Sequence, residues 1–327
     1  MHLHPAIEAA YAVLDGHALT RAEALALGEV QGPDLLDLVS LTNKVRVAFA
    51  KPIVPCSIVN AKSGHCSQNC RFCAQAACHN TGIDEHPLMT ADAIVADARK
   101  VYLQGVRTYG IVTGGRGYER PTPEFEAILE AIDRLHVAFP DLHVCVSLGL
   151  LSDETAARLA AHGVHRYNMN LQTAPERYGE LIATTHTIEE KVATIRALKR
   201  HGIGTCTGGI LGLGETWADR VSLAFACRDL DVDGIPLNVL LPIPGTPLED
   251  RPILQPAEVA RTFAMVRLVN PTKTLKFAAG RETTMKDFQG LLMLAGMNSF
   301  ITGGYLTTRG RSVPEDEAFR TALEAFS

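Results

Sequence analysis

The sequence contains no long apolar run and no strong excess of one charge. No stretch of its 327 residues approaches the length needed to cross a bilayer, and no basic start followed by an apolar segment opens the chain. We therefore expect a cytoplasmic protein without a membrane partner. The formal net charge of -5 gives no basic field that would attract phosphate backbones, so nucleic acid is a poor candidate partner. A small-molecule substrate is expected instead.

Low-complexity linkers are also missing, and the composition is that of a folded protein. Hydrophobic residues make up 46% and charged residues 20%, which are ordinary values for a globular chain. A chain of this length fits a single α/β barrel. We therefore expect one catalytic domain.

Short β-rich runs alternate with amphipathic helical stretches from about residue 53 onward. The expected strands lie near residues 54–60, 107–113, 142–148, 164–170, 203–210, 234–240, 273–278 and 299–304. The expected helices are Ala91–Gln104, Pro123–Ala138, Glu154–Ala161, Ile188–His201, Ala218–Leu230 and Pro256–Val269. This alternation predicts a parallel (β/α)8 barrel of the TIM type, an α/β fold, over residues 51–327. Two or three short helices, including Arg21–Leu27 and Leu35–Phe49, predict an N-terminal helical cap over residues 1–50.

Eight cysteines in a cytosolic chain are explained more readily by metal ligation or chemistry than by disulfides. Cys66, Cys70 and Cys73 form a C-x3-C-x2-C pattern after the first expected strand, where barrel active sites lie. No fourth cysteine follows at a matching interval, so three thiolates could hold three irons of a cluster and leave the fourth iron open. Thiolate ligands also suit zinc, which would need a fourth ligand such as Cys78 or His79. Zinc therefore stays as the alternative.

This pattern, with the aromatic Phe72 before the last cysteine, resembles the signature of the radical S-adenosylmethionine superfamily. The resemblance implies a [4Fe-4S] cluster on Cys66, Cys70 and Cys73, whose open iron binds S-adenosylmethionine. Reductive cleavage of that cofactor yields methionine and a 5′-deoxyadenosyl radical. The protein's part is then to orient a substrate against the radical and to exclude water.

Further segments resemble biotin synthase in unbroken order from about residue 30 to the C-terminus. They are SIVNAKSGHCSQNCRFCAQ at 57–75, YNMNLQT at 167–173, CTGGILGLGET at 206–216, GTPLED at 245–250, FAAGRE at 277–282 and NSFITGGYLTT at 298–308. The resemblance implies a sulfurtransferase that inserts sulfur into dethiobiotin to form biotin. It also implies a low-potential electron donor of the flavodoxin or ferredoxin type, and a homodimer.

Carried over by residue, the resemblance also implies a site for S-adenosylmethionine. That site consists of Phe72, the Thr113–Gly114 turn near the methionine end, Asn170, Gln172, Lys191, and Ile210 and Leu241 near the adenine. Gln172 stands where the family has an aspartate, so a charge-assisted hydrogen bond to the ribose becomes a neutral one. Met169 replaces a histidine and, by strand alternation, is expected to point away from the cavity.

The same resemblance makes Asn168, Asn170 and Asn238 contacts to dethiobiotin, whose ureido ring needs hydrogen-bond donors and acceptors in an otherwise apolar pocket. The alternative is that these asparagines end strands or fill turns. Asn168 and Asn170 lie two residues apart on one expected strand and so share a face, which favours a site.

The family keeps a second cluster deep in the barrel, held by three cysteines and an arginine. Cys145, Cys206 and Arg281 match three of these positions, but Gly110 in TYGIV stands where the remaining cysteine is expected. Cys56 lies on the neighbouring strand, so we infer that Cys56, Cys145 and Cys206 hold this auxiliary cluster. A four-iron cluster with an additional sulfide is expected, with [2Fe-2S] as the alternative. Arg281 is expected to tune or shield it, or else to pair with a carboxylate.

Two rival functions stay open from the sequence. One is another radical enzyme of the same barrel family, such as a hydrogenase-cofactor maturase or a methylornithine-type mutase, which the change at Gly110 keeps possible. The other is a zinc-dependent binding protein without catalysis. Cys227, on an amphipathic helix, is expected to be a buried apolar residue, and the role of Cys78 is undecided.

Overall fold

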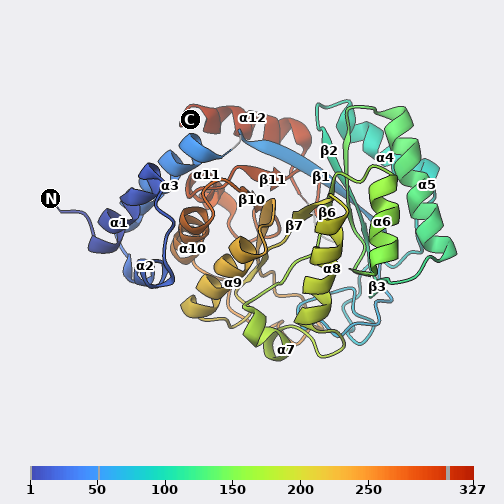
Figure 1. The fold of residues 1–327 in the computed structure, drawn as a ribbon, viewed down its shortest axis with the longest axis horizontal. Helices are drawn as coiled ribbons and strands as arrows, with labels where there is room; N and C mark the ends of the chain where they lie inside the picture. The colour runs from blue at the N-terminus through green and yellow to red at the C-terminus, as the bar shows by residue number, and fades with distance from the viewer. Residues whose placement is uncertain (1, 51, 307–309) are drawn as a thin grey trace.

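The computed structural model describes residues 2–50, 52–306 and 310–327, and its centre is a closed barrel of eight parallel strands (Figure 1). The barrel strands are β1 (Val54–Lys62), β2 (Thr108–Thr113), β4 (His143–Ser147), β6 (Arg166–Asn168), β7 (Gly204–Cys206), β9 (Gly234–Val239), β10 (Thr274–Phe277) and β11 (Ser299–Ile301). They are hydrogen-bonded in this order, and β11 pairs with β1 to close the ring. The predicted TIM-type fold is confirmed.

Three short strands extend this arrangement. β8 (Gly209–Leu211) continues β7 after a break and pairs with β9, so one predicted strand is split into two. β3 (Gly117–Tyr118) and β5 (Leu150–Leu151) form a separate parallel pair. These residues follow β2 and β4, so they lie at the carboxyl end of the barrel.

Helices cover the outside of the barrel. They are α4 (Ala91–Tyr102), α5 (Pro123–Ala138), α6 (Asp153–Ala161), α8 (Ile188–Arg200), α9 (Trp217–Asp229) and α10 (Pro256–Val269). Most begin where a hydroxyl side chain accepts a hydrogen bond from the N3 backbone N–H, as at Thr90, Thr122, Ser152, Thr187 and Thr216. These caps fix the lengths of the loops between strand and helix, where barrel active sites are built.

The N-terminal segment packs beside α9 and α10. It contains α1 (Pro5–Ala10), η1 (Tyr11–Asp15), α2 (Arg21–Ala26), η2 (Leu27–Glu29) and α3 (Asp34–Phe49). Its apolar side chains join the same buried core as those of the barrel. The Trp217 indole N–H donates to the Leu25 carbonyl at 3.0 Å, and Arg228 donates to the Leu19 carbonyl at 2.8 Å. The segment is therefore attached to the barrel through apolar packing and through hydrogen bonds to its backbone carbonyls.

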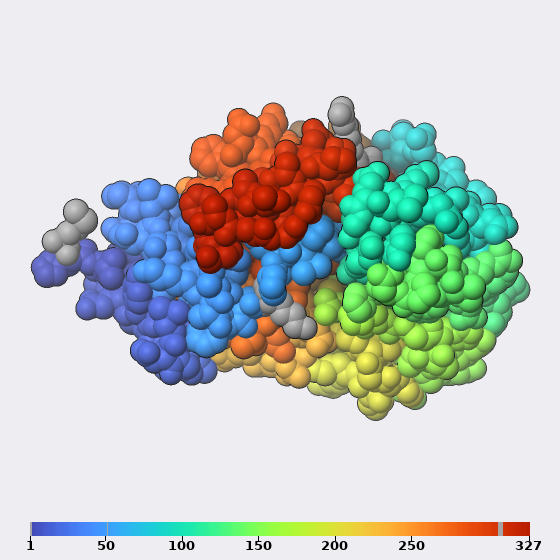
Figure 2. Space-filling view, turned by 90° about the horizontal axis from the view of Figure 1, so that it is seen from above, coloured from blue at the N-terminus to red at the C-terminus, as the bar shows by residue number. Residues whose placement is uncertain are grey.

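Several elements were not predicted from the sequence. They are η3 (Pro175–Arg177), α7 (Tyr178–Leu181), η4 (Lys286–Phe288), α11 (Gln289–Leu294) and the C-terminal α12 (Val313–Glu324). Figure 2 shows α12, in red, lying across the surface between the N-terminal helices and the chain around residue 100. Residues 307 and 308, the end of the NSFITGGYLTT segment, lie outside the described residues. Among the described residues, no helix combines the length and the apolar character that a membrane span requires.

Candidate active site

A cavity of about 310 Å³ lies inside the barrel, a volume within the range of small-molecule sites. It reaches from the loop after β1 down to Thr108, the first residue of β2. The predicted site residues that line it are Cys56, Phe72, Cys73, Cys145, Asn168, Asn170, Gln172, Cys206, Ile210, Asn238 and Leu241. Residues from widely separated parts of the sequence thus meet in one cavity.

The loop between β1 and α4 carries the C-x3-C-x2-C pattern at the upper end of the cavity. Its backbone is folded back on itself, because the Cys66 N–H donates to the Gln75 carbonyl at 3.1 Å and the Cys73 N–H donates to the Cys70 carbonyl at 3.0 Å. The loop before α8 holds it from outside, since the Arg71 N–H donates to the carbonyl of residue 182 at 2.9 Å. The three thiols are therefore presented by a fixed loop.

The thiols of this loop fit a cluster better than a single zinc ion. Burial raises the pKa of Cys70 to about 12 and that of Cys73 to about 11, and the neighbouring cysteines add to both shifts. Such thiols ionise at neutral pH only when a bound metal displaces their protons. Within the described ranges, no three His, Cys, Asp or Glu side chains converge on one metal-sized point, as a zinc site requires. A four-iron cluster does not require such convergence, because each thiolate binds a different iron.

Lys191 lies on α8 next to the cysteine loop, and it does not itself line the cavity. Its side chain is buried, its Nζ is 3.7 Å from the Met169 sulfur, and it lies 5.7 Å from the centre of the Tyr178 ring. Burial lowers the pKa of Lys191 to about 8, opposed by the nearby Cys70. Among the described residues no carboxylate forms an ion pair with it. A buried ammonium in this position fits an anionic ligand group such as an amino-acid carboxylate.

The remaining predicted cofactor groups lie at the cavity or beside the cysteine loop. Gln172 has a left-handed backbone, with φ 73°, and its buried Oε1 has no hydrogen-bond partner among the described residues. The Asn170 Oδ1 accepts a hydrogen bond from the Gly208 N–H at 3.1 Å. Thr113 and Gly114 do not line the cavity but approach the cysteine loop, where a Cβ on Gly114 would lie 2.5 Å from the Gln75 side chain.

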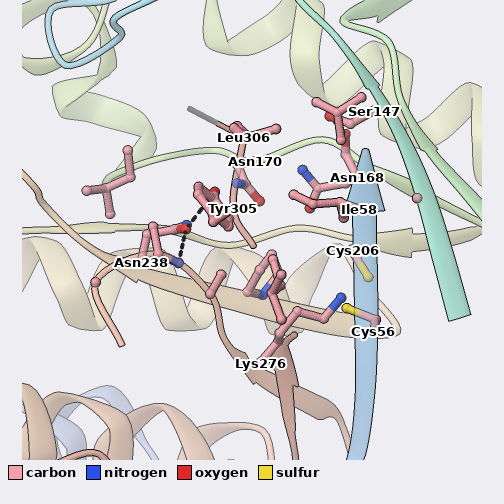
Figure 3. Close-up of a pocket in the computed structure, with 18 of the residues that line it drawn as sticks. Cys56, Ile58, Ser147, Asn168, Asn170, Cys206, Asn238, Lys276, Tyr305 and Leu306 are labelled. Atoms are coloured by element: carbon pink, nitrogen blue, oxygen red, sulfur yellow. Dashed lines mark hydrogen bonds between the residues drawn. The ribbon is translucent and has the colours of Figure 1, made fainter. Parts of the chain in front are cut away.

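Asn238, on β9, is held by three hydrogen bonds on the wall of the cavity (Figure 3). Its Nδ2 donates to the Gly209 carbonyl at 3.0 Å. Its Oδ1 accepts from the Ala279 N–H at 3.0 Å and from the Tyr305 hydroxyl at 3.1 Å. These contacts fix the orientation of the amide, so the group that Asn238 presents to a ligand is its second N–H. Tyr305 was not predicted from the sequence.

Three thiols from three strands meet deeper in the cavity. Cys56 of β1, Cys145 of β4 and Cys206 of β7 all line it, and burial together with Cys206 and Cys56 raises the pKa of Cys145 to about 12. Gly234 on β9 leaves room for one of them, because a Cβ there would lie 2.9 Å from the Cys206 sulfur. Gly110 also faces the cavity, opposite Cys145 in the strand register. The site therefore offers three sulfur ligands and open space beside them.

Two cationic side chains accompany these thiols, and sequence reasoning missed both. Lys276 of β10 and Arg166 of β6 line the cavity, and Figure 3 shows the Lys276 amine directed at the Cys56 sulfur. Burial lowers the pKa of Lys276, but Cys56 and Cys206 outweigh this and raise it overall. Strand alternation in TLKF at 274–277, with buried Leu275 and Phe277 on either side of the lysine, was the signal available.

The structure does not bring Arg281 to this cavity. Its buried guanidinium donates to Asp316 Oδ2 of α12 at 2.7 Å, to Gln289 Oε1 at 2.8 Å and to the Ile301 carbonyl at 3.1 Å. It lies 4.8 Å from the centre of the Phe300 ring. Arg281 follows the end of β10, so its long side chain is free of strand alternation and turns outward toward the carboxylate.

Comparisons with known proteins cover the whole chain. Residues 62–227 match the Radical SAM superfamily, and residues 236–324 match the Biotin and Thiamin Synthesis associated domain. The biotin synthase of Chlorobaculum tepidum is 55% identical over an alignment of 329 positions that covers 99% of this chain and 99% of the relative. The biotin synthase of Chlorobium luteolum is 54% identical and covers 99% of this chain and 98% of the relative.

Solved structures add support for the fold. Methylornithine synthase superimposes with a TM-score of 0.82 at 17% identity, over 97% of this chain and 99% of that protein. A maturase of the [FeFe]-hydrogenase gives 0.81 at 16% identity, over 97% of this chain and 73% of that protein. Identities this low show a shared fold alone. The rival functions are not favoured, because the identity to the biotin synthases is far higher. The prediction of a biotin synthase is confirmed, and the chain belongs to the biotin synthase family of the radical S-adenosylmethionine superfamily.

Proposed function

We propose that this chain converts dethiobiotin to biotin by radical insertion of sulfur, using S-adenosylmethionine, a [4Fe-4S] cluster and an auxiliary iron–sulfur cluster. The observation that supports it is the order of groups along one cavity. Phe72 and Cys73 of the cysteine loop line the cavity after the end of β1. Figure 3 shows the amides of Asn168 and Asn170 above the deep thiols of Cys56 and Cys206. A substrate held by the amides would lie between a radical source above and a sulfur source below.

The upper end of the cavity serves the radical step. Cys66, Cys70 and Cys73 would hold the [4Fe-4S] cluster, which together with S-adenosylmethionine supplies a 5′-deoxyadenosyl radical when both are bound. Lys191 would pair with the cofactor's carboxylate, and Gln172 would use its unpartnered oxygen on the ribose. These charged and polar contacts would orient the cofactor, and the walls of the barrel around the cavity would limit the access of water to the radical.

That end of the cavity also offers apolar and aromatic surface to the rest of the cofactor. Ile210 and Leu241 would contact the adenine, and Phe72 would pack against the cofactor beside the cluster. Thr113 and Gly114 would lie near the methionine end, where the absence of a side chain on Gly114 lets the cysteine loop approach closely. Asn170 would contribute to this site and to the substrate site, because it lies between them.

The middle of the cavity serves substrate binding. The fixed second N–H of Asn238 suits the ureido carbonyl oxygen of dethiobiotin, and Asn168 and Asn170 supply further amide groups on the same wall. A buried site built to hydrogen-bond one ligand rejects analogues that leave its polar groups unpaired. The amides would thus fix which carbon atoms of the substrate face the radical.

The deep thiols serve the sulfur step. Cys56, Cys145 and Cys206 would hold the auxiliary cluster, for which we propose four irons and an additional sulfide, with [2Fe-2S] as the alternative. The family carries a thiolate at position 110, on β2. Cys56 on β1 would replace it, because β1 and β2 pair directly. The absence of a side chain at Gly110, which lines the cavity, leaves the cluster the volume that a cysteine there would fill.

Arg281 has a different part in this proposal from the one that its sequence position indicated. Its contacts with Asp316 favour the carboxylate-pairing alternative, in which it fastens α12 to the barrel. A cytoplasmic location, the flavodoxin- or ferredoxin-type donor and the homodimer stay predictions from the resemblance.

The test is an anaerobic reaction of reconstituted protein with S-adenosylmethionine, a low-potential reductant and dethiobiotin, followed by mass spectrometry. The proposal predicts both 5′-deoxyadenosine and biotin. Deoxyadenosine without biotin would show a radical enzyme with another substrate, as in the maturase or mutase alternative. Neither product from a protein loaded with iron and sulfide would contradict the proposal as a whole.

A further inference from the structure

The deep thiol site is flanked by two positive side chains that reach it from different parts of the barrel. Arg166 opens β6, which lies between the strands of Cys145 and Cys206, and it pairs with Cys145 in the strand register. Lys276 lies on β10, separated from the strand of Cys56 only by β11. Its amine points at the Cys56 sulfur (Figure 3). The two cations therefore enclose the three thiols.

Neither cation has an ion pair with a carboxylate in the described part of the chain. The charged groups that act on Lys276 are the three deep thiols, and those that act on Arg166 are Cys206, Cys145 and the carboxylate of Asp233. The Asp233 carboxylate itself accepts a hydrogen bond from the Thr205 N–H at 2.7 Å. Arg166 Nε is buried and has no hydrogen-bond partner among these residues. For Lys276 the counter-charge must therefore come from the sulfur site.

A buried cation without a counter-ion is costly, so its position indicates an anion nearby in the working protein. Thiolates and the sulfides of a bound cluster are anions of this kind. Hydrogen bonds to cluster sulfurs and the net charge around a cluster are also what sets its reduction potential. Both cations are placed to act in this way, because they line the same cavity as the three thiols.

We propose that Lys276 and Arg166 are positioning residues of the deep site, whose fixed positive charges retain the auxiliary cluster and raise its reduction potential. Lys276 contributes more, since it has no carboxylate to offset its charge. It acts through hydrogen bonds to sulfur on the Cys56 side of the site. This proposal rests on the proposed function, because it assumes that the deep thiols hold an iron–sulfur cluster.

The test uses the full chain with Cys66, Cys70 and Cys73 changed to alanine, so that any remaining cluster belongs to the deep site. In this background, Lys276→Met keeps the volume of the side chain and removes the charge. We expect a midpoint potential shifted to lower values and a rate of iron loss to a chelator about tenfold faster. Arg166→Met is expected to cause smaller changes in the same directions.

Two further variants separate charge from structure. Lys276→Arg keeps the charge and should keep the midpoint potential near that of the background protein. Lys273→Met is the matched control, because Lys273 precedes the same strand but pairs outside the cavity with Asp231, at 2.7 Å. It should change neither the potential nor the rate of iron loss.

The outcomes distinguish this proposal from the one it rests on. A deep cluster with the same potential and chelator stability in Lys276→Met as in the background protein would overturn the role of Lys276 and leave the deep cluster standing. A background protein that binds no cluster at all would overturn both proposals. If Lys276→Met fails to fold, Lys276→Arg and Arg166→Met decide. If Lys276→Met folds, an equal shift of the midpoint potential in Lys276→Arg and Lys276→Met would contradict a role for charge.

Discussion

The two cysteine sites of this barrel are built in opposite ways. The upper site lies in one loop, where three thiols within eight residues are held by local backbone hydrogen bonds and remain partly exposed. The deep site takes one thiol from each of β1, β4 and β7, and it is enclosed by the barrel. The upper site can therefore be identified from spacing alone, whereas the deep site exists only through the closure of the sheet.

The largest effect is expected from removing the upper site alone. Cys70→Ala removes a proposed ligand of the radical cluster, so formation of 5′-deoxyadenosine should fall by at least about 10³-fold while the deep cluster is retained. The measurement is deoxyadenosine by mass spectrometry together with iron and sulfide content. Cys78→Ala is the matched control, since Cys78 is exposed and lies in the same loop. An equal loss in the control would contradict the assignment of ligands.

Removing the deep site alone should separate the two products. In Cys56→Ala, deoxyadenosine should still form at near the wild-type rate, and biotin should be lost, because the radical source is intact and the sulfur source is not. Cys227→Ala is the control, because Cys227 is buried on α9 outside the cavity. Biotin formed by Cys56→Ala at the wild-type rate would rule out Cys56 as a ligand.

The same comparison can be sharpened by moving the thiol back to β2. A Cβ at position 110 would lie 3.1 Å from Ile58 Cγ2, which is tight, so Cys56→Ala with Gly110→Cys also needs Ile58→Ala, which removes that methyl group. This triple variant should regain part of the biotin that Cys56→Ala loses, as measured in the same assay. If the triple variant regains its iron content but forms no more biotin than Cys56→Ala, the position of the thiol and not its presence limits sulfur transfer.

A substitution of Arg281 tests whether this residue stabilises the fold or belongs to the auxiliary cluster. Arg281→Met breaks a buried ion pair with Asp316 and should lower the free energy of unfolding by about 3–5 kcal/mol, measured by urea unfolding. The iron content of the folded protein should not change. The control is Arg320→Met on α12, the helix that carries Asp316. The exposed pair of Arg320 with Glu317 contributes about 1 kcal/mol at most. Loss of the auxiliary cluster without loss of stability would return Arg281 to the cluster.

The smallest effect is expected from changing an asparagine that lies between the two cysteine sites. Asn168→Ala removes one amide that we propose to contact the substrate, so the KM for dethiobiotin should rise about tenfold with deoxyadenosine formation preserved. Steady-state kinetics measure this change. Asn43→Ala, on the exposed side of α3, should leave the KM unaltered, and an unchanged KM in Asn168→Ala would show that this amide does not contact the substrate.

Much of the fold could be predicted because its signals are local. Alternating apolar runs mark the barrel strands, and Pro123–Ala138 and Pro256–Val269 are helices with the predicted bounds. The C-terminal α12 was missed although Ser312 and Glu315 form a capping box at its start. The segment is rich in charge, and its buried Asp316 pairs with the distant Arg281, which spacing along the chain does not reveal.

The deep site could be predicted only in part, for a related reason. The cysteines were found by a resemblance and by the adjacency of two strands, but the accompanying cation was sought in the loop at Arg281. Lys276 lies on the strand itself, where alternation turns it inward, whereas Arg281 lies beyond the strand and is free to turn outward. Strand parity was therefore the better guide to the cavity than the position of a basic residue in a motif.

The central claim is that Cys56, Cys145 and Cys206 hold a cluster of their own. Mössbauer spectroscopy of iron-57-reconstituted protein, with Cys66, Cys70 and Cys73 changed to alanine, tests it most directly. The account predicts that one iron–sulfur cluster remains in this protein and disappears when Cys56→Ala is added. A cluster that survives the loss of Cys56, or a protein that binds no cluster once the upper cysteines are gone, would contradict it.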